Sequence, residues 1–334
     1  MATMKDVAKA AGVSLGSVSH YLNDRVPVSR EKAARIQRAV DALGYRVDQS
    51  ARSLRRRRTQ SVGLIIPDIS NPFYAELARV LEHRLWDEGF QTFLCDSAHD
   101  VERERAHFTN LLDRRADGIV VIYEGEASEL PKLAAQTTTP VVFLDRPVEG
   151  LVSVATDNRL GGALVARHLL SLGHTLVGAL VGDGEVANMR ARMEGFAAAL
   201  GAGGVTLTPD YTRHGAQNLA LGERAAELMA LPEPPTAIFA TNDIVAVGAW
   251  RTLLTLGFRI PDDVSLIGFD DIEMGRLLLP PLSTVAQDIS ALGVHAAELL
   301  LNPSELPAHA RSAVITPRLV PRGSTAAPRE RSAM

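Results

Sequence analysis

The apolar positions of the first 45 residues recur at helical spacing and predict three short helices separated by cap residues. Thr3 and Asp6 make a capping box for the first helix, and Gly12 ends it. Ser14 and Ser29 are suited to cap the second and third helices. Two short helices around a glycine turn, completed by a third, are the plan of a helix-turn-helix domain. The side chains expected to face inward are Met4, Val7, Ala8, Ala11, Val18, Leu22, Ala33, Ile36, Val40 and Leu43.

From Ser61 onwards, uniformly apolar short segments alternate with amphipathic segments of helical spacing. Strands joined in this way through helices make parallel sheets covered on both faces, and two sets of them indicate two similar lobes. The pattern predicts an N-terminal all-α head followed by a two-lobed α/β core with parallel sheets. The expected strands are 62–66, 92–94, 118–122, 141–144, 176–181, 237–240 and 264–268, with helices near 73–88, 101–114, 158–172, 188–200, 219–230 and 243–256.

Charge is distributed unevenly along the chain. Residues 1–58 hold 13 Lys and Arg against 5 Asp and Glu, a balance of +8, whereas the other 276 residues hold 22 against 34, a balance of −12. The net charge of −4 therefore hides a basic head on an acidic body. Such an arrangement concentrates the attraction for nucleic-acid phosphates in the helix-turn-helix part.

The basic character continues into a segment that follows the third helix. Residues 48–54 are long enough for one or two helical turns, and Arg55–Arg58 is an unbroken basic run. Adjacent arginines are commonly a solvated linker, but here they lie beside Leu54, which has no apolar neighbour in the sequence to pack against. A leucine on a basic helix is what a wedge in the minor groove of DNA requires.

Several other classes of protein are excluded or disfavoured. No apolar run reaches the roughly 18 residues of a membrane span, and the first residues lack the apolar stretch of a secretory signal. Cys95 is the only cysteine, which fits a reducing compartment and predicts a cytoplasmic protein. The nine histidines show no metal-ligand spacing, and no nucleophile or phosphate-loop motif is present. Residues 182–187 fit a relaxed dinucleotide-binding turn but lack its acidic partner, so neither an enzyme nor a cofactor is expected.

Polar and aromatic residues gather directly after the predicted strands. In open parallel α/β sheets, ligands bind at the carboxyl ends of strands, beside helix N-termini. Each residue alone has an ordinary reading as a cap or an ion-pair partner, but together they favour a pocket for a small polyhydroxylated or heterocyclic ligand. These residues are Asp68, Asn71, Phe73, Tyr74, Asp145, Arg146, Arg190, Arg192, Thr241, Asn242, Asp243, Phe269, Asp270 and Asp271.

Seven segments of the chain resemble, in order, the LacI/GalR family of bacterial transcription regulators. MKDVAKAAGVSLGSVSHYLN resembles the helix-turn-helix of the family, and ARSLRRRRTQSVGLIIPDISNPFY its hinge and the start of its core. HLLSLGH, RMEGF, TNDIVAVG, VSLIGFDD and PPLSTVAQD follow. The resemblance covers the chain from Met4 to about Arg322. It implies a hinge helix, a core of the periplasmic-binding-protein type crossed three times by the chain, and a homodimer on a pseudo-palindromic DNA operator.

The resemblance also implies boundaries. It assigns residues 1–47 to the DNA-binding head, 48–60 to the hinge helix and linker, and 61–322 to the effector-binding and dimerisation core. The N-lobe would hold about 61–156 and 285–316, and the C-lobe about 157–284 and 317–322. Residues 323–334 are polar and are predicted to be a disordered tail. They carry no leucine heptad, so a tetramer-forming extension is not expected.

By position, the resemblance assigns base reading to the start of the second helix, phosphate contacts around it, and the minor-groove wedge to the hinge. Two departures modify this picture. Leu15 and Gly16 cannot make bidentate hydrogen bonds to bases, so readout is expected to depend on His20, Arg25 and DNA shape. Val47-Asp48 replaces the Pro-Asn of many members, which leaves Asp48 as a cap whose charge opposes phosphate. The implied DNA-binding residues are Ser14, Leu15, Gly16, Ser17, His20, Asn23, Arg25, Arg52, Leu54 and Arg55.

The resemblance further implies a small-molecule effector that controls DNA binding, and the family favours a sugar or sugar derivative. Phe73 and Tyr74 are equally suited to sandwich a purine, so a nucleobase-like corepressor stays open. A sugar-binding carrier would share the core, but the basic head and the missing signal sequence oppose it. The implied effector-binding residues are Phe73, Tyr74, Asp145, Arg146, Arg192, Asn242, Asp270 and Gln287.

Overall fold

The computed structural model describes residues 2–23, 28–45, 59–123, 125–183, 187–302 and 312–329. The chain divides into two compact units, Met1–Thr59 and Gln60–Met334, which are described separately. Arg25, Arg52, Leu54, Arg55 and the side chain of Asn23 lie outside the described residues, as does most of the predicted hinge helix.

The first unit contains three helices, α1 (Met4–Ala11), α2 (Leu15–Asn23) and α3 (Arg30–Leu43). The predicted capping box is confirmed, with Thr3 N donating to Asp6 Oδ2 at 2.8 Å and Asp6 N to Thr3 Oγ1 at 3.3 Å. Gly12 ends α1 at a φ of 61°, the left-handed conformation that glycine adopts without strain. Local chemistry therefore sets where α1 begins and where it ends.

The core of the first unit is small. Val7, Val18 and Ile36 are fully buried, one from each helix, and Ala39 joins them. The prediction that Leu43 faces inward is wrong, because Leu43 is 40% exposed. It lies in the last turn of α3, beyond the cluster that Ile36 and Ala39 share with α1 and α2.

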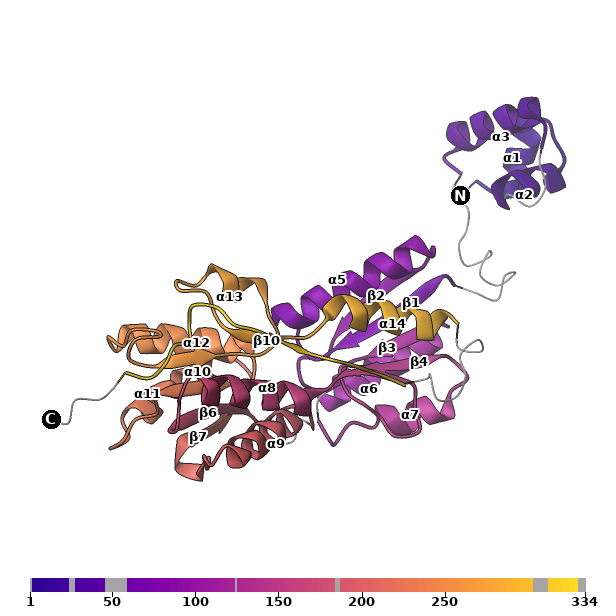
Figure 1. Ribbon diagram of the computed structural model, residues 1–334. Coiled ribbons are helices and arrows are strands. Elements are labelled where there is room, and N and C mark those ends of the chain that lie inside the picture. The colour runs from indigo at the N-terminus through magenta and orange to yellow at the C-terminus, as the bar shows by residue number, and fades with distance from the viewer. Residues whose placement is uncertain are drawn as a thin grey trace. The chain divides into compact units, whose positions relative to one another are not determined.

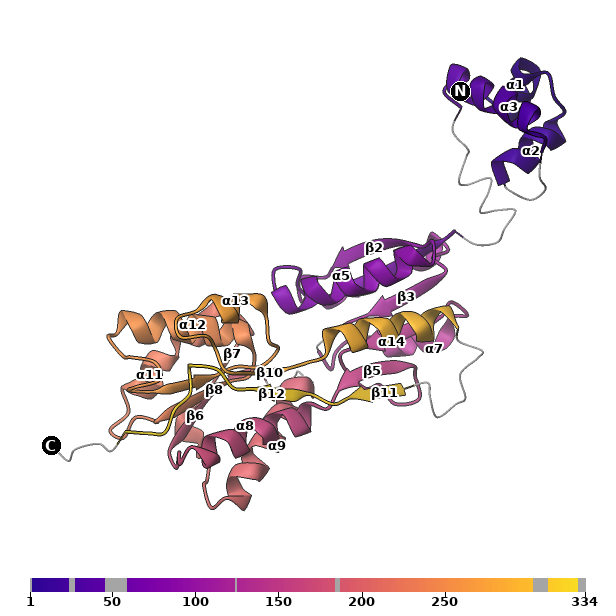
Figure 2. The same cartoon turned by 45° about the horizontal axis from the view of Figure 1, so that its top comes forward.

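The second unit has two lobes, each a parallel sheet between helices (Figure 1). The first sheet has the strand order β11-β5-β4-β3-β1-β2. Helices α5 and α14 cover one face and lie side by side in both views (Figures 1 and 2), while α6 and α7 pack on the other face. The strands are β1 (Ser61–Ile66), β2 (Gln91–Asp96), β3 (Gly118–Val121), β4 (Val141–Leu144), β5 (Ser153–Thr156) and β11 (Ser312–Ile315), and the helices are α5 (Pro72–Asp87), α6 (Val101–Asp113), α7 (Leu130–Gln136) and α14 (Ile289–Leu301).

The second sheet has the order β7-β6-β8-β9, with α8 and α9 on one face and α10, α11 and α12 on the other. The predicted helix at 219–230 is broken at Arg224 into α10 and α11. The strands are β6 (Val177–Gly182), β7 (Thr212–Gly215), β8 (Ala237–Ala240) and β9 (Ser265–Ile267). The helices are α8 (Asn158–Ser171), α9 (Ala187–Ala202), the 3₁₀ turn Pro209–Tyr211, α10 (Leu219–Glu223), α11 (Ala225–Met229), α12 (Asp243–Thr255) and α13 (Glu273–Leu277).

The chain passes between the lobes three times, after β5, after β10 (Thr284–Ala286) and after β11. β10 pairs antiparallel with β12 (Arg318–Val320), with Thr284 opposite Val320. The two lobes are thus joined by adjacent segments that come from distant parts of the sequence. No helix among the described residues is long and apolar enough to cross a bilayer.

The prediction of a disordered tail is wrong for residues 323–329, which pack against β9. Ser324 is fully buried, accepts from Ser283 N at 2.8 Å through its hydroxyl and accepts from Leu266 N at 2.9 Å through its carbonyl. Ala326 N donates to Ser265 Oγ at 3.0 Å. The polar composition of these residues predicted disorder, but in the structure their polar groups make hydrogen bonds with the edge strand β9. Residues 330–334 lie outside the described residues.

Candidate functional site

In the first unit, the start of α2 is open at the surface. Leu15 is 43% exposed, and Gly16 and His20 are also exposed, whereas Val18 holds the helix on the core. A Cβ at Gly16 would meet only Ser14 Oγ, at 3.8 Å, so packing within the head does not require glycine there. A small residue on an exposed helix start suits close approach of another surface.

Two of the predicted phosphate contacts already have partners within the head. Ser14 Oγ accepts from Ser17 N at 3.1 Å, which makes Ser14 the N-cap of α2, and its hydroxyl lies 2.9 Å from that of Ser17. Ser14 is exposed and Ser17 half-buried. Both hydroxyls therefore have a structural role beside any contact with phosphate.

In the second unit, Arg192 is the centre of a buried polar network at the ends of the second lobe's strands. Its side chain is 2% exposed. The guanidinium donates through Nε to Asn158 Oδ1 at 2.7 Å and through Nη1 to the Thr241 carbonyl at 2.6 Å, and Nη2 lies 3.4 Å from Asp270 Oδ1. It also stacks on Phe269 at 3.7 Å from the ring centroid. All three nitrogens have protein partners, so Arg192 organises the site.

Asp270 lies between Arg192 and Gln287. Gln287 Nε2 donates to Asp270 Oδ1 at 2.8 Å, and both side chains are buried. Burial raises the pKa of Asp270 to about 6, against the opposing effects of Arg192 and Gln287. Gln287 Oε1 is buried without a hydrogen-bond partner among the described residues. A buried acceptor left open in this way is suited to a donor on a ligand.

The backbone at Asp270 and Asp271 is held in an uncommon conformation, with φ angles of 119° and 61°. Asp271 is paired with Arg276 at 3.0 Å and with Arg322. Ile272 N donates to Asp243 Oδ2 at 3.0 Å, and burial with the neighbouring charge of Asp270 raises the pKa of Asp243 well above its usual value. Non-glycine residues at positive φ persist where surrounding contacts hold them, often at functional sites.

Both Asp270 and Gln287 line a cavity of about 290 Å³ at the segments where the chain crosses between the lobes. Acidic side chains outnumber basic ones on its walls. The other lining residues are Glu76, Asp271, Arg276, Ala286, Asp288, Ile289, Ser290, Thr316 and Arg318. The cavity therefore offers mainly hydrogen-bond acceptors.

Asp145 and Arg146 lie on the first lobe, directly after β4. Asn188, in the first turn of α9, donates through Nδ2 to the carbonyl and to Oδ2 of Asp145, both at 2.9 Å. Arg146 stacks on Tyr123 at 4.3 Å from the ring centroid. The contact between Asn188 and Asp145 joins the two lobes, as does the ion pair of Arg190 with Glu126 at 2.6 Å.

Phe73 and Tyr74 are placed differently from the expectation. They are 2% and 5% exposed within the core of the first lobe, and their rings meet edge to face, with centroids 5.3 Å apart and planes at 67°. A base needs two roughly parallel rings with space between them. The interpretation of Phe73 and Tyr74 as a purine sandwich is therefore wrong.

Asn242 has the role of a cap. Its Oδ1 accepts from Val245 N at 2.8 Å at the start of α12, and its Nδ2 lies 3.4 Å from Gln217 Oε1. Sequence reasoning missed Asn158, which contacts Arg192, and Asn188, which contacts Asp145. Thr241 follows a predicted strand and is among the predicted strand-end residues, whereas Asn158 follows β5, a strand that the pattern did not predict.

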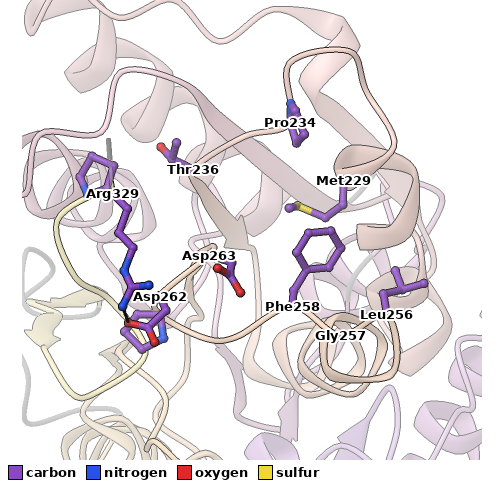
Figure 3. A pocket seen from close by; sticks show the side chains of 11 residues that line it. Met229, Pro234, Thr236, Leu256, Gly257, Phe258, Asp262, Asp263 and Arg329 are labelled. Atoms are coloured by element: carbon purple, nitrogen blue, oxygen red, sulfur yellow. Dashed lines mark hydrogen bonds and ion pairs between the residues drawn. The ribbon is translucent and has the colours of Figure 1, made fainter. Parts of the chain in front are cut away.

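A larger cavity of the second unit, about 640 Å³, lies elsewhere (Figure 3). Met229, Leu256 and Phe258 form its apolar side. Its charged groups are already paired, Arg329 with Asp262 at 2.8 Å and Asp263 with Arg259 at 2.6 Å. None of the predicted effector residues lines it.

Comparison with known proteins agrees with both units. Residues 3–48 match the bacterial regulatory proteins of the lacI family, and residues 166–325 match the periplasmic binding protein-like domain. The HTH-type transcriptional regulator DegA of Bacillus subtilis (strain 168) is 35% identical over 296 residues, 87% of this chain and 88% of DegA. The ribose operon repressor of Escherichia coli (strain K12) is 33% identical over 329 residues, 97% of this chain and 100% of the repressor.

Among solved structures, the lac repressor dimer bound to operator and the anti-inducer ONPF has a TM-score of 0.86 at 27% identity, covering 98% of this chain and 99% of that one. A helix-turn-helix head followed by a periplasmic-binding-protein-like core defines the class of ligand-responsive DNA-binding regulators. The chain belongs to the lacI family of bacterial regulatory proteins.

Proposed function

We propose that the protein is a sequence-specific transcriptional repressor whose affinity for a pseudo-palindromic operator is set by a small-molecule effector. The observation that carries the proposal is the surface of α2, where Leu15, Gly16 and His20 are exposed while Val18 anchors the helix. Helix starts of this kind enter the major groove and read base edges. A binding protein without turnover accounts for both units, so no enzymatic activity is proposed.

The experiment measures binding of the purified protein to DNA fragments from its own gene neighbourhood, by fluorescence anisotropy, with a panel of sugars and nucleobases. We expect palindrome-dependent binding that one compound changes at least tenfold, which corresponds to about 1.4 kcal/mol of coupling. An increase identifies a corepressor and a decrease an inducer. Weak binding that ignores both DNA sequence and every compound would contradict the proposal and favour a carrier protein.

The effector proposed is a sugar or sugar derivative, bound by Asp270 and Gln287. An ionised carboxylate and an open amide oxygen both accept hydrogen bonds, which suits ligand hydroxyl groups. Asp270 is held for this role by Arg192, and Asp145 and Arg146 would face the ligand from the first lobe. The alternative of a purine loses its main support, because Phe73 and Tyr74 leave no space between their rings.

Effector affinity is expected to depend on pH through Asp270. With a pKa of about 6, this carboxyl is ionised above pH 7 and becomes protonated below pH 6, so it stops accepting hydroxyl donors. Affinity for the compound found in the panel should be constant above pH 7 and fall by up to about tenfold per pH unit below pH 6. Isothermal titration between pH 5 and 8 measures this.

Asp270→Asn is the control for the pH experiment. It should bind the effector about 10- to 100-fold more weakly at pH 7.5, the loss expected for hydrogen bonds to a charged group, with little variation below that pH. A wild-type profile that stays flat from pH 5 to 8 would exclude Asp270 as a ligand contact.

We further propose a homodimer formed through exposed apolar side chains of the second unit. Trp86, Phe93 and Leu94, on α5 and the edge strand β2, are 63%, 46% and 47% exposed. Leu277 and Leu279, at and after the end of α13, are 76% and 85% exposed. Figures 1 and 2 place α5, β2 and α13 along the same upper side of this unit. Exposed apolar side chains in such numbers are typical of a protein interface.

Replacing both Leu277 and Leu279 by Asp should convert the dimer to monomers in light scattering after size exclusion, because charges would then be buried at the contact. Operator affinity should fall at least tenfold, since each half-site would be bound separately. Leu256→Asp is the matched control, because Leu256 is 52% exposed at the end of α12. Dimers that persist in the double variant would show that the interface lies elsewhere.

Lobe closure is the proposed route from effector to DNA. Asn188 with Asp145, and Arg190 with Glu126, are contacts between lobes that an effector would strengthen or weaken. A ligand shifts such an equilibrium only by its differential affinity for the two states, typically ~1–3 kcal/mol. In this proposal, a shift between the open and closed states of the lobes changes how the two heads of the dimer are presented to the operator. The hinge residue Leu54 is proposed to contact the minor groove.

A further inference from the structure

Helix α3 makes one polar contact with the turn that precedes α2 and another with the last turn of α2. Just before α2 begins, Arg35 Nη2 donates to the carbonyl of Gly12 at 3.0 Å. In the last turn of α2, the Tyr21 hydroxyl donates to Gln37 Oε1 at 2.8 Å. Apolar packing holds the middle of α2, where Val18 is fully buried while Tyr21 and Leu22 are half-buried. Because the contact of Arg35 is with Gly12 and not with α2 itself, the tilt of α2 about Val18 depends on the hydrogen bond of Tyr21 to Gln37.

The direction of the Tyr21 hydrogen bond follows from a third residue. Gln37 Nε2 donates to Asp41 Oδ1 at 2.8 Å, one turn further along α3. A carboxylate can only accept, so the amide nitrogen of Gln37 faces Asp41 and its carbonyl oxygen faces Tyr21. The proton of the Tyr21 hydroxyl then goes to Gln37. Asp41 thereby holds Gln37 in the one orientation that accepts from Tyr21.

The geometry of α2 converts a small displacement at Tyr21 into one at the exposed end. Tyr21 and Leu15 lie three residues on either side of Val18, about 4.5 Å along the helix in each direction. A shift of Tyr21 away from α3 would thus move Leu15 by a similar amount in the opposite sense. Contacts with base edges depend on such displacements, whereas attraction to phosphates depends on charge at longer range.

We propose that Tyr21, held by Gln37 and Asp41, is a positioning residue that sets the angle of α2 and so the specificity of operator readout. The inference rests on the DNA-binding function proposed above. Tyr21 acts through the helix and does not touch the DNA. The contact contributes to discrimination between operator and other DNA, and not to the attraction that the basic head has for any duplex.

The test uses the full-length protein and an operator obtained by selection from random duplexes. Anisotropy then gives the affinity for that operator and for an unrelated duplex at several salt concentrations. Tyr21→Phe should bind the operator about 3- to 10-fold more weakly, the value expected for one hydrogen bond. Affinity for the unrelated duplex and the dependence on salt should be unchanged. Tyr45→Phe is the matched control, since Tyr45 is half-buried against the same core, and it should bind as the wild type does.

Gln37→Met removes the acceptor at similar side-chain size. It should cause the same loss as Tyr21→Phe, and the double variant should lose no more than either single variant, because both remove one interaction. Additive losses, or none, would overturn the proposal. So would a Tyr21→Phe variant that weakens binding to both duplexes and lowers the salt slope by about 0.9, the signature of a lost phosphate contact.

Two further outcomes are distinguishable. Hydrogen exchange of the full-length Tyr21→Phe variant should show α1 and α3 protected as in the wild type. Loss of protection throughout residues 2–45 would assign Tyr21 to the stability of the head and overturn a role in positioning. A wild-type protein that selects no sequence would overturn the DNA-binding function itself, and this proposal with it.

Discussion

Replacing Arg192 by Met is expected to lower the free energy of unfolding by about 3–5 kcal/mol at pH 8. The side chain is 2% exposed and provides hydrogen bonds or charge to Asn158, Thr241 and Asp270. Its removal leaves the buried carboxylate of Asp270 without its cationic partner, which is the costly part of breaking a buried ion pair. Urea unfolding monitored by circular dichroism measures the loss. The effector response should disappear as well.

The loss of unfolding free energy in Arg192→Met is expected to become smaller as the pH falls. Burial raises the pKa of Asp270 from 3.8 to about 6, so the folded state binds this proton more readily than the unfolded chain. In the wild type, this carboxyl therefore stabilises the fold progressively as the pH falls from 6 towards 4. Arg192 lowers the pKa of Asp270, so this pKa should rise further when Arg192 is replaced. Protonation then removes the unpaired charge, and Arg192→Met should recover stability relative to the wild type between pH 8 and pH 5.

Two control variants distinguish the cost of leaving a buried charge unpaired from the cost of losing any ion pair. Arg159→Met breaks the surface pair with Glu194, whose side chains are 64% and 50% exposed, and should cost less than about 1 kcal/mol. Adding Asp270→Asn to Arg192→Met should restore part of the stability at pH 8, because no charge is then left buried. An equal loss in the single and double variants at pH 8 would show that packing of Arg192 on Phe269 is the dominant contribution.

Gly162→Ala is expected to lower the free energy of unfolding by about 3 kcal/mol or more. Helices α8 and α9 approach so closely that a Cβ at Gly162 would lie 1.8 Å from the carbonyl oxygen of Arg192. In return, a Cβ at Gly195 would lie 1.8 Å from the carbonyl oxygen of Arg159. Backbone atoms cannot move aside as a flexible side chain can, so one methyl group must separate the helices. Because that backbone belongs to Arg192, effector binding should weaken as well.

Gly201→Ala is the matched control in the same pair of helices. Gly201 lies near the end of α9 and is exposed, and a Cβ added there would meet no atom within 4 Å. Alanine has the higher helix propensity, so the free energy of unfolding should be unchanged or raised by up to about 1 kcal/mol. If Gly162→Ala were as stable as Gly201→Ala in urea, the close approach of α8 and α9 would not be a constraint.

Features of one helical turn could be read from the sequence. The capping box of Thr3 and Asp6, the cap at Ser14 and the left-handed Gly12 depend on residues within four positions of one another. The seven predicted strands and the alternation of strands with helices are present for a similar reason, since apolar runs and helical spacing are local patterns. Asp270 could be predicted as a ligand-binding residue because it follows a predicted strand.

Other elements depend on remote partners. β10 and β12 are three residues each and exist because Thr284 and Val320 pair across the crossings between the lobes. The pattern did not predict α14, which is apolar around much of its circumference and lies buried against α5 and the sheet, so no amphipathic stripe marks it. Residues 323–329 were predicted to be disordered, because polar composition does not reveal that a strand edge is available.

The sequence by itself determined the helix-turn-helix head, the two-lobed parallel α/β core and the set of polar residues at strand ends. It did so because caps and hydrophobic spacing act within a few residues. The tertiary structure decided which of those residues contact one another. Arg192 contacts Asn158, Thr241 and Asp270. Phe73 and Tyr74 are packed in the core of the first lobe. The partners of Arg192 come from segments 34 to 78 positions away in the sequence. The burial of these side chains sets their charge and orientation, and a local pattern does not specify burial.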